Sequence, residues 1–279
     1  MDKKSVQAVA VTIFSGVLFL ESMFAGGVAS EETGKVLDGM RGLRRVNNVH
    51  YFVTNSYSGN QDIVQQTQEI WADLLDGTWV AEYKNTDADG AMTFLKEFSD
   101  GVTVNSYQAG IWSEWDGYST TTDIPNYQAL TNLGYREEDI VSAECVDLDD
   151  GATQIVFSLS GQQLKEKRDQ ALNLIEPAGM EEKDDTEQMD KMSVYYEQYQ
   201  KTGYQNERIA YTINKSGVLT RMEYSFDVTR PKVVIKGGEQ KLEGEEEYAM
   251  GVKIKVLSYN QENIPKVIRQ CAADAGYDR

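Results

Sequence analysis

The sequence predicts an α+β protein that consists mainly of antiparallel β-sheet. Apolar residues recur at every second position in several long runs, whereas the helical period of 3.6 is confined to a few segments. Polar or charged residues occupy the alternate positions, which is typical of strands with one buried and one solvated face, as antiparallel sheets allow. Only four prolines occur in the chain, which favours long continuous strands.

The N-terminus has the features of an export signal. Lys3 and Lys4 precede an apolar stretch over residues 6–20, and Glu21 ends this stretch. A membrane-spanning helix needs about 20 apolar residues, so the stretch is short for a span and suits the hydrophobic region of a signal peptide. Retention of the segment as a membrane anchor is the alternative.

Small residues at positions 28–30 offer a cleavage site, so we expect residues 1–30 to be a signal peptide and Glu31 to begin the mature chain. No Cys lies in this region, and the residues give no support for a lipid anchor. We therefore expect an exported protein of the cell envelope or the extracellular space.

The chain is strongly acidic, with a formal net charge of −18. Such a field repels the phosphates of nucleic acids and the head groups of anionic lipids, which excludes nucleic acid as an expected partner. It favours a soluble protein, and we expect a monomer.

The first element after the signal is a short amphipathic helix, because Val36, Met40 and Leu43 are spaced at one helical face. At Val49 the period switches from 3.6 to two, which predicts a strand. The same alternation returns in five further runs, which we expect to be strands: Met92 to Phe98, Ile155 to Leu159, Ile209 to Ile213, Met222 to Val228 and Tyr248 to Val256.

Three Gly-containing turns separate strand-like runs and are expected to close β-hairpins, because glycine supplies the positive φ that tight turns need. They are Ser99–Gly101, Asp149–Gly151 and Lys215–Gly217.

A helical insertion is expected at about residues 161–202. Two sets of residues at helical spacing predict two helices, joined by an acidic connector at 176–185 that contains Pro and Gly. The sets are Leu164, Arg168, Leu172 and Ile175, followed by Met189, Met192, Tyr196 and Tyr199. Nothing in the composition marks a domain boundary, so we expect residues 31–279 to form one β-rich domain.

No motif of an enzyme is present. The sequence has no HExxH, Walker A or dinucleotide-binding pattern. Its one histidine, His50, is not accompanied by a motif that would supply a Ser or Cys nucleophile. We therefore expect a non-enzymatic protein without a cofactor.

One segment resembles the start of a calcium-binding loop, because Asn85, Asp87 and Asp89 place oxygen-bearing side chains at alternate positions before Gly90. The position that should supply a bidentate glutamate is Lys96. An ordinary hairpin loop is the alternative, since turns favour the same residue types.

Two cysteines, Cys145 and Cys271, show no metal-ligand spacing. In an oxidising compartment they are either paired in a disulfide or remain two independent thiols, and the sequence leaves both open.

Aromatic residues are concentrated in the first half of the chain, where all four tryptophans lie. On adjacent strands such side chains either line a cavity for an apolar ligand or fill an ordinary core.

The order of these elements resembles a known family. The helix GKVLDGMRGLRRVNN is followed by VHYFVTNSY and IWADLLDGTWVAEY, and the chain closes with ERIAYTINKSGVLTRMEYSFDV and YAMGVKIKVLSYNQENIPKVI. This order is similar to the lipoprotein-carrier fold of the LolA and LolB carriers, the LppX and LprG lipoproteins and uncharacterised Gram-positive envelope proteins. The chain departs from the lipoproteins in lacking their lipid-bearing Cys.

The resemblance implies a curved, incomplete β-barrel, or half-barrel, that wraps around helices and holds a lipid-like or other apolar ligand in its concave face. The residues expected to contact such a ligand are Tyr51, Val53, Trp79, Phe94, Trp112, Met189, Met192 and Tyr196. The alternative function is an envelope sensor or interaction module on the same scaffold, whose partner is another envelope protein.

Overall fold

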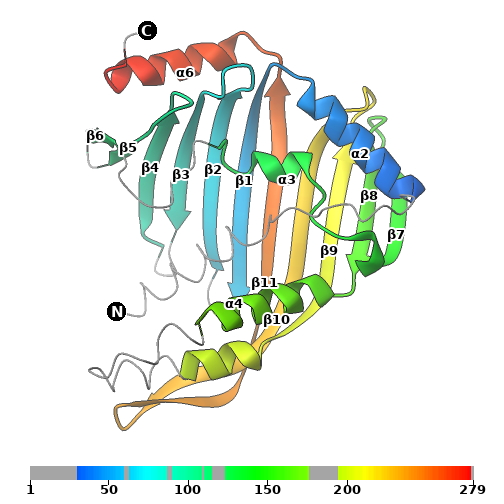
Figure 1. Cartoon of the computed structure of the whole chain (residues 1–279), viewed down its shortest axis with the longest axis vertical. Coiled ribbons are helices and arrows are strands. Elements are labelled where there is room, and N and C mark those ends of the chain that lie inside the picture. Colours follow the sequence, from blue (N-terminus) through cyan, green and yellow to red (C-terminus); the bar gives the residue numbers. More distant parts are fainter. Residues whose placement is uncertain are drawn as a thin grey trace.

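The structure, a computed structural model, describes residues 30–59, 63–86, 90–108, 110–114, 123–175 and 194–277. Its strands form one antiparallel sheet in the order β6-β5-β4-β3-β2-β1-β11-β10-β9-β8-β7. Since β6 and β7 end this order without pairing to each other, the sheet is open (Figure 1). The expected fold class, an α+β half-barrel built mainly on antiparallel sheet, is confirmed.

Two groups of strands meet at the centre of the sheet, where β1 pairs with β11. The first group is β1 (Asn48–Gly59), β2 (Ile63–Asp73), β3 (Trp79–Thr86), β4 (Met92–Ser99), β5 (Val104–Gln108) and β6 (Ile111–Glu114). The second group is β7 (Ile140–Asp147), β8 (Thr153–Leu159), β9 (Gly203–Ile213), β10 (Leu219–Lys236) and β11 (Glu239–Tyr259).

The helices lie on both faces of this sheet. On the inner face, α2 (Glu31–Arg44) and α3 (Tyr127–Thr131) cross the upper half, while α4 (Gln162–Ile175) and a helix at residues 194–200 lie at the lower end (Figure 1). A 3-10 turn, η1 (Glu137–Asp139), precedes β7. The outer face carries α6 (Asn263–Asp274).

The inner face holds the main core because residues of one parity point toward the helices on each strand. Val49, Tyr51 and Val53 of β1 are fully buried there. The predicted helical face of α2 packs onto them, with Val36, Met40 and Leu43 all buried in the same cluster. The predicted helix and strand are therefore confirmed together with their buried faces.

The three Gly-containing turns all close hairpins, between β4 and β5, β7 and β8, and β9 and β10. Gly101, Gly151 and Gly217 have φ values of 86°, 78° and 75°. These values lie in the left-handed region that glycine adopts without strain, as the sequence predicts.

A second, smaller core lies on the outer face. Val80 and Phe98 of the sheet pack against Ile264, Ile268 and Cys271 of α6. The period-two pattern does not predict this helix. Among the described residues, the helix in this cluster contacts β1, β2, β3 and β4.

None of the described helices has both the length and the apolar character that a membrane span requires. The signal or anchor expected at residues 1–30 lies almost entirely outside the described residues, which begin at Ser30. Cys145 and Cys271 are free thiols, one exposed on β7 and the other buried on α6.

We predict opposite effects for two glycine-to-alanine changes in α2. A Cβ at Gly42 would lie 2.6 Å from the carbonyl oxygen of Gly217, in the turn that joins β9 and β10. Gly42→Ala should therefore lower the free energy of unfolding by about 1–3 kcal/mol through steric strain.

The matched control is Gly34→Ala, since a Cβ at Gly34 meets nothing within 4 Å. This change should raise the free energy of unfolding by up to about 1 kcal/mol through helix propensity alone. Urea unfolding of both variants measures the difference, and equal shifts in both would contradict the packing of α2 on the turn.

Candidate functional site

On the inner face of β1 and β11, burial is complete under α2 and α3 and incomplete further along, until Tyr248 of β11 is buried again. On β1, Val53 is fully buried, but Tyr57 is only half-buried. On β11, Ile254 is fully buried, while Val252 and Met250 are half-buried. The described helices thus cover the upper half of these strands completely and the lower half only in part.

Five of the incompletely covered residues form a set that we call the apolar strip. It consists of half-buried apolar and aromatic side chains packed against the main core: Tyr57, Tyr83, Tyr127, Met250 and Val252. They come from β1, β3, β11 and α3. The register places Tyr57 directly opposite Met250. Polar side chains lie between its members, since Asn55 of β1 pairs with Val252 and Gln68 of β2 pairs with Tyr83.

The upper border of the strip is α3, which is fixed to the sheet and to α2. The Tyr51 hydroxyl donates to the carbonyl oxygen of Pro125, and the Asn126 amide donates to the buried Gln68 side chain at 2.6 Å. The Arg44 guanidinium contacts the carbonyl oxygen of Thr131 and is 3.0 Å from the Asn132 side-chain oxygen. These contacts hold Tyr127 in place at the upper end of the strip.

The lower border is an aromatic pair with a cation. The rings of Tyr57 and Tyr248 are 4.6 Å apart, and the Arg230 guanidinium lies 4.9 Å from the centre of the Tyr248 ring. Glu246 accepts a 2.6 Å hydrogen bond from Arg230. A cation held over an aromatic face in this way is stabilised by the ring quadrupole.

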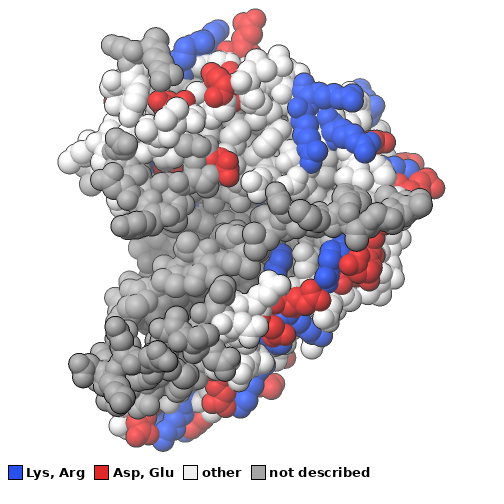
Figure 2. All heavy atoms as spheres, in the orientation of Figure 1, with Lys and Arg blue, Asp and Glu red and all other residues white. Residues whose placement is uncertain are grey.

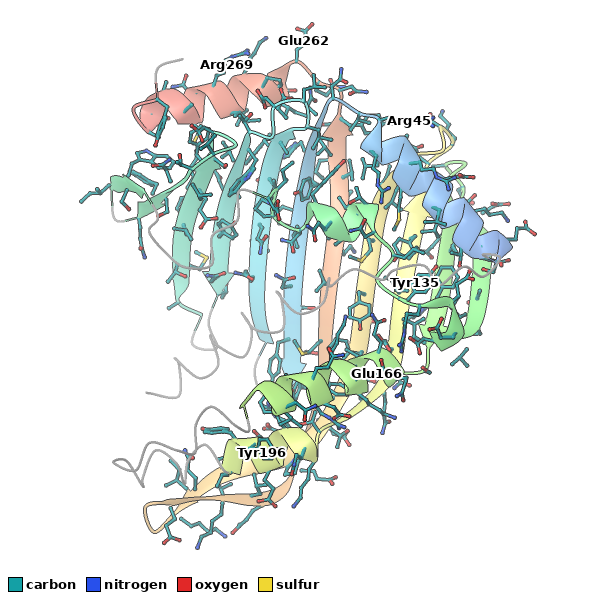
Figure 3. The ribbon with its side chains drawn as sticks, in the orientation of Figure 1. Arg45, Tyr135, Glu166, Tyr196, Glu262 and Arg269 are labelled. Atoms are coloured by element: carbon teal, nitrogen blue, oxygen red, sulfur yellow. The ribbon has the colours of Figure 1, made fainter. Side chains whose placement is uncertain are left out.

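The helix at residues 194–200 lies beside this border. Gln198, which is buried, donates to the carbonyl oxygen of Pro231 at 2.6 Å, and Gln240 donates to the Tyr195 hydroxyl at 3.4 Å. Tyr196 lies on the same helix, next to the hairpin that β10 and β11 form beyond the sheet (Figure 3).

A few polar groups lie among the apolar ones. The Tyr83 hydroxyl donates to Glu97 at 2.6 Å, and burial raises the pKa of the Glu97 carboxyl. The Tyr127 hydroxyl is buried without a hydrogen-bond partner in the structure, and burial raises its pKa to about 12. Such a combination of apolar surface and few polar groups is typical of sites that bind small apolar molecules.

A second buried polar pair lies under α4. The Tyr224 hydroxyl donates to Glu207 at 2.5 Å, and burial raises the pKa of the Glu207 carboxyl. The other carboxylate oxygen of Glu207 has no hydrogen-bond partner in the structure. This pair lies on β9 and β10, in the part of the sheet that α4 covers, and none of the strip residues belongs to it.

Charged side chains surround the helix-bearing face. Lys and Arg gather over the end of α2 that carries Arg41, Arg44 and Arg45, while acids and bases alternate along α4 (Figure 2). Among the described residues, no group of three His, Cys, Asp or Glu side chains is placed to hold a metal ion.

The residues expected to contact a ligand fall into three groups. Tyr51, Val53 and Trp79 lie on the inner face, where they are buried in the main core. Phe94 and Trp112 lie on the outer face. Phe94 shares the parity of Phe98, which belongs to the α6 cluster, and Trp112 packs against that cluster.

The third group is on the helical insertion, where Tyr196 is half-buried on the helix at 194–200. Met189 and Met192 lie outside the described residues. Of the oxygen-bearing residues expected at a calcium loop, Asn85 is exposed at the end of β3, whereas Asp87 and Asp89 lie outside the described residues.

Sequence reasoning missed Tyr57 and Tyr127 of the strip. Tyr57 shares the parity of Tyr51 and Val53, so the period-two pattern contained its signal. Tyr127 had no such signal, because α3 is a five-residue helix that is too short to show a period.

No family model matches the sequence, and no curated protein matches it by sequence similarity. Among solved structures, the lipoprotein LppX of Mycobacterium tuberculosis is similar at 10% identity and a TM-score of 0.38, over 82% of this chain and 94% of LppX.

Two other solved structures are similar over most of their length. LprF of Mycobacterium bovis shares 12% identity at a TM-score of 0.36, over 84% of this chain and 95% of LprF. A LolA-superfamily protein of Nitrosomonas europaea shares 9% identity at a TM-score of 0.25, over 82% of this chain and 95% of its own.

Both kinds of protein that the sequence resembles, LppX-type lipoproteins and LolA-type carriers, are thus found among similar solved structures. Because all three TM-scores are low, no ligand and no residue role is transferred from these proteins to this chain.

We predict that Glu97→Gln stabilises the protein at neutral pH. Burial raises the pKa of Glu97 in the folded state, so its favourable contribution is complete below the unfolded pKa of about 4 and is lost as pH rises through the raised value. Glutamine keeps the acceptor for Tyr83 and carries no charge.

Urea unfolding between acidic and neutral pH measures the effect. The gain of Glu97→Gln over the wild type should shrink toward zero as the pH falls to about 4. The exposed Glu247→Gln is the control for general charge effects. A gain for Glu97→Gln that is independent of pH would contradict the prediction.

Proposed function

We propose that the protein is an exported, non-enzymatic envelope protein that binds a lipid-like or other apolar ligand on the apolar strip. The observation that carries the proposal is the incomplete burial of Tyr57, Met250 and Val252 on the inner face, although Val53 and Ile254 of the same strands are fully buried. Large apolar side chains at this border gain free energy when a ligand completes their burial.

The ligand is proposed to lie across the central strands, with an acyl chain or a similar apolar body on Tyr57, Met250 and Val252. Its polar end would face α3, where the Tyr127 hydroxyl has no partner in the structure and Glu97 is held by Tyr83. A buried hydroxyl without a partner is unfavourable, so a ligand oxygen that accepts from Tyr127 would add to the affinity.

Binding and release need no catalytic step and no cofactor. Burial raises the pKa values of three titratable groups described at the strip, the Glu97 carboxyl and the Tyr83 and Tyr127 hydroxyls. A deprotonated tyrosine is disfavoured in such surroundings, which supports a role of these hydroxyls as hydrogen-bond donors to a ligand.

Nile red, a fluorescent apolar probe, tests the location of binding. Tyr57→Ser and Met250→Ser should each weaken its binding about tenfold or more, because each removes a large apolar contact from the strip. The matched control is Phe94→Ser, which removes an exposed aromatic residue from the outer face.

Circular dichroism of each variant checks that the fold is retained. Full affinity in both strip variants, or an equal loss in Phe94→Ser, would contradict binding on the inner face.

We further propose that export removes residues 1–29 and that the mature protein starts at Ser30, one residue before the position expected from the sequence. Ser30 caps α2 by accepting from the Thr33 amide at 3.2 Å, and its own amide lies 2.8 Å from a Glu137 carboxylate oxygen. A cap of this kind contributes about 1 kcal/mol, which cleavage after Ser30 would forfeit.

Residues 27–29, Gly-Val-Ala, also offer a small-x-small pattern for this cleavage. The intact mass of the exported protein is expected to correspond to residues 30–279. A mass lower by one serine residue would place the cut after Ser30, and a mass that includes residues 1–29 would exclude cleavage.

A further inference from the structure

The last strand of the sheet, β7, leaves one edge unpaired. It pairs with β8 on one side, and in the part of the chain that the structure describes no strand pairs with its other side. Seven of its eight residues are exposed. A free strand edge presents a row of main-chain donors and acceptors that another strand can complete.

This edge has few of the features that usually protect a free edge from pairing. A register shift near Val141 disturbs its first residues, but Ser142 to Asp147 pair with β8 in unbroken register. This regular segment contains no Pro and no Lys, the residues that most often block edge pairing. The edge also exposes apolar surface, since Val141 is 69% exposed and Val146 is 48% exposed.

The chain segment that contains β7 carries charge of one sign. Between Glu137 and Ala152 the chain carries seven acidic residues and no Lys or Arg. On the outer side of β7, Glu144 stands opposite Val156 and makes no ion pair among the described residues. A strand placed beside Glu144 is therefore stabilised by basic side chains and destabilised by acidic ones.

This charge argues against a second copy of the chain as the occupant. Pairing two β7 strands would place two copies of the same acidic segment side by side, in molecules that each carry a formal net charge of −18. Like charges on neighbouring strands are destabilising. The complementary occupant is an extended segment with basic and apolar residues in alternation.

We propose that β7 is a docking edge for a basic, extended segment of another protein, which adds to the sheet as a further strand beyond β7. Main-chain hydrogen bonds to Ser142–Asp147 would supply affinity. Glu144 would select basic side chains on the outer side, and Ala143 and Cys145, which pair with the buried Phe157 and Ile155, would contact the apolar side chains on the inner side. This inference goes beyond ligand binding on the apolar strip and does not depend on it, because β7 lies at the far end of the sheet from β3 (Figure 1).

The test uses a capped peptide of alternating valine and lysine with the length of β7. Hydrogen exchange of the mature protein is measured by mass spectrometry at increasing peptide concentrations. Exchange of the Ser142–Asp147 amides should become slower as peptide is added and should reach a plateau. A control peptide of the same sequence, N-methylated on the backbone at alternate positions, should give no such protection. Absence of protection, or equal protection by both peptides, would overturn the proposal.

Two charge variants separate strand docking from general attraction. Glu144→Lys should weaken the protection several-fold, whereas Glu247→Lys, an exposed change on β11, should leave it unchanged. Equal weakening by both would mean that net charge alone attracts the peptide. A peptide-free dimer whose Ser142–Asp147 amides are already protected would identify a second copy as the occupant instead.

The two cysteines give an independent readout on the unmodified protein. The peptide should slow alkylation of the exposed Cys145, which lies within the proposed docking segment. Cys271 is 2% exposed, and burial raises its pKa to about 11, so it should stay unreactive with and without peptide. Unchanged alkylation of Cys145 at saturating peptide would contradict docking at β7.

Discussion

The pairing of β1 with β11 is the constraint on which the rest of the molecule depends. It joins residues as distant in the chain as Val49 and Tyr259, and it makes one sheet from the strands before residue 115 and those after residue 139. Without it, the two groups of strands would not share one inner face. The apolar strip draws Tyr57 from β1 and Met250 and Val252 from β11, so the same pairing also creates the candidate site.

The two faces of the sheet are used differently. On the inner face, α2 and α3 are fixed by close packing at Gly42 and by the contacts of Arg44, Tyr51 and Gln68, so they cover the upper half firmly. On the outer face, α6 covers only the upper ends of the first strands. Half-buried apolar side chains of the strip thus lie on the lower inner face, and a main-chain edge without a partner strand among the described residues lies elsewhere, on β7.

Much of this fold could be predicted because its signals are local. The alternation of Tyr51 and Val53 with polar neighbours, the spacing of Val36, Met40 and Leu43, and the positive φ of Gly101 all follow from a few consecutive residues. The face on which a given aromatic residue lies is a different matter, because it depends on register across several strands. Phe94 and Trp112 lie on the outer face for this reason, although both are aromatic like the buried residues of the inner face.

The candidate site was harder to predict than the fold, since its boundary is set by where α3 and the helix at 194–200 lie. No pattern within β1 or β11 distinguishes Val53 from Tyr57 or Ile254 from Met250, yet the first of each pair is sealed and the second is not. That difference depends on tertiary packing, and α3, with only five residues, is too short to show a helical period in the sequence.

The central claim is that this protein carries an apolar ligand on its inner face. Native mass spectrometry of the mature protein, purified from the envelope fraction of the cells that produce it, tests this claim most directly when it is followed by denaturation and lipid extraction. The account predicts a co-purifying acyl or isoprenoid species that is released on denaturation. A protein that is isolated without any ligand, and that also fails to take up added lipids, would contradict it.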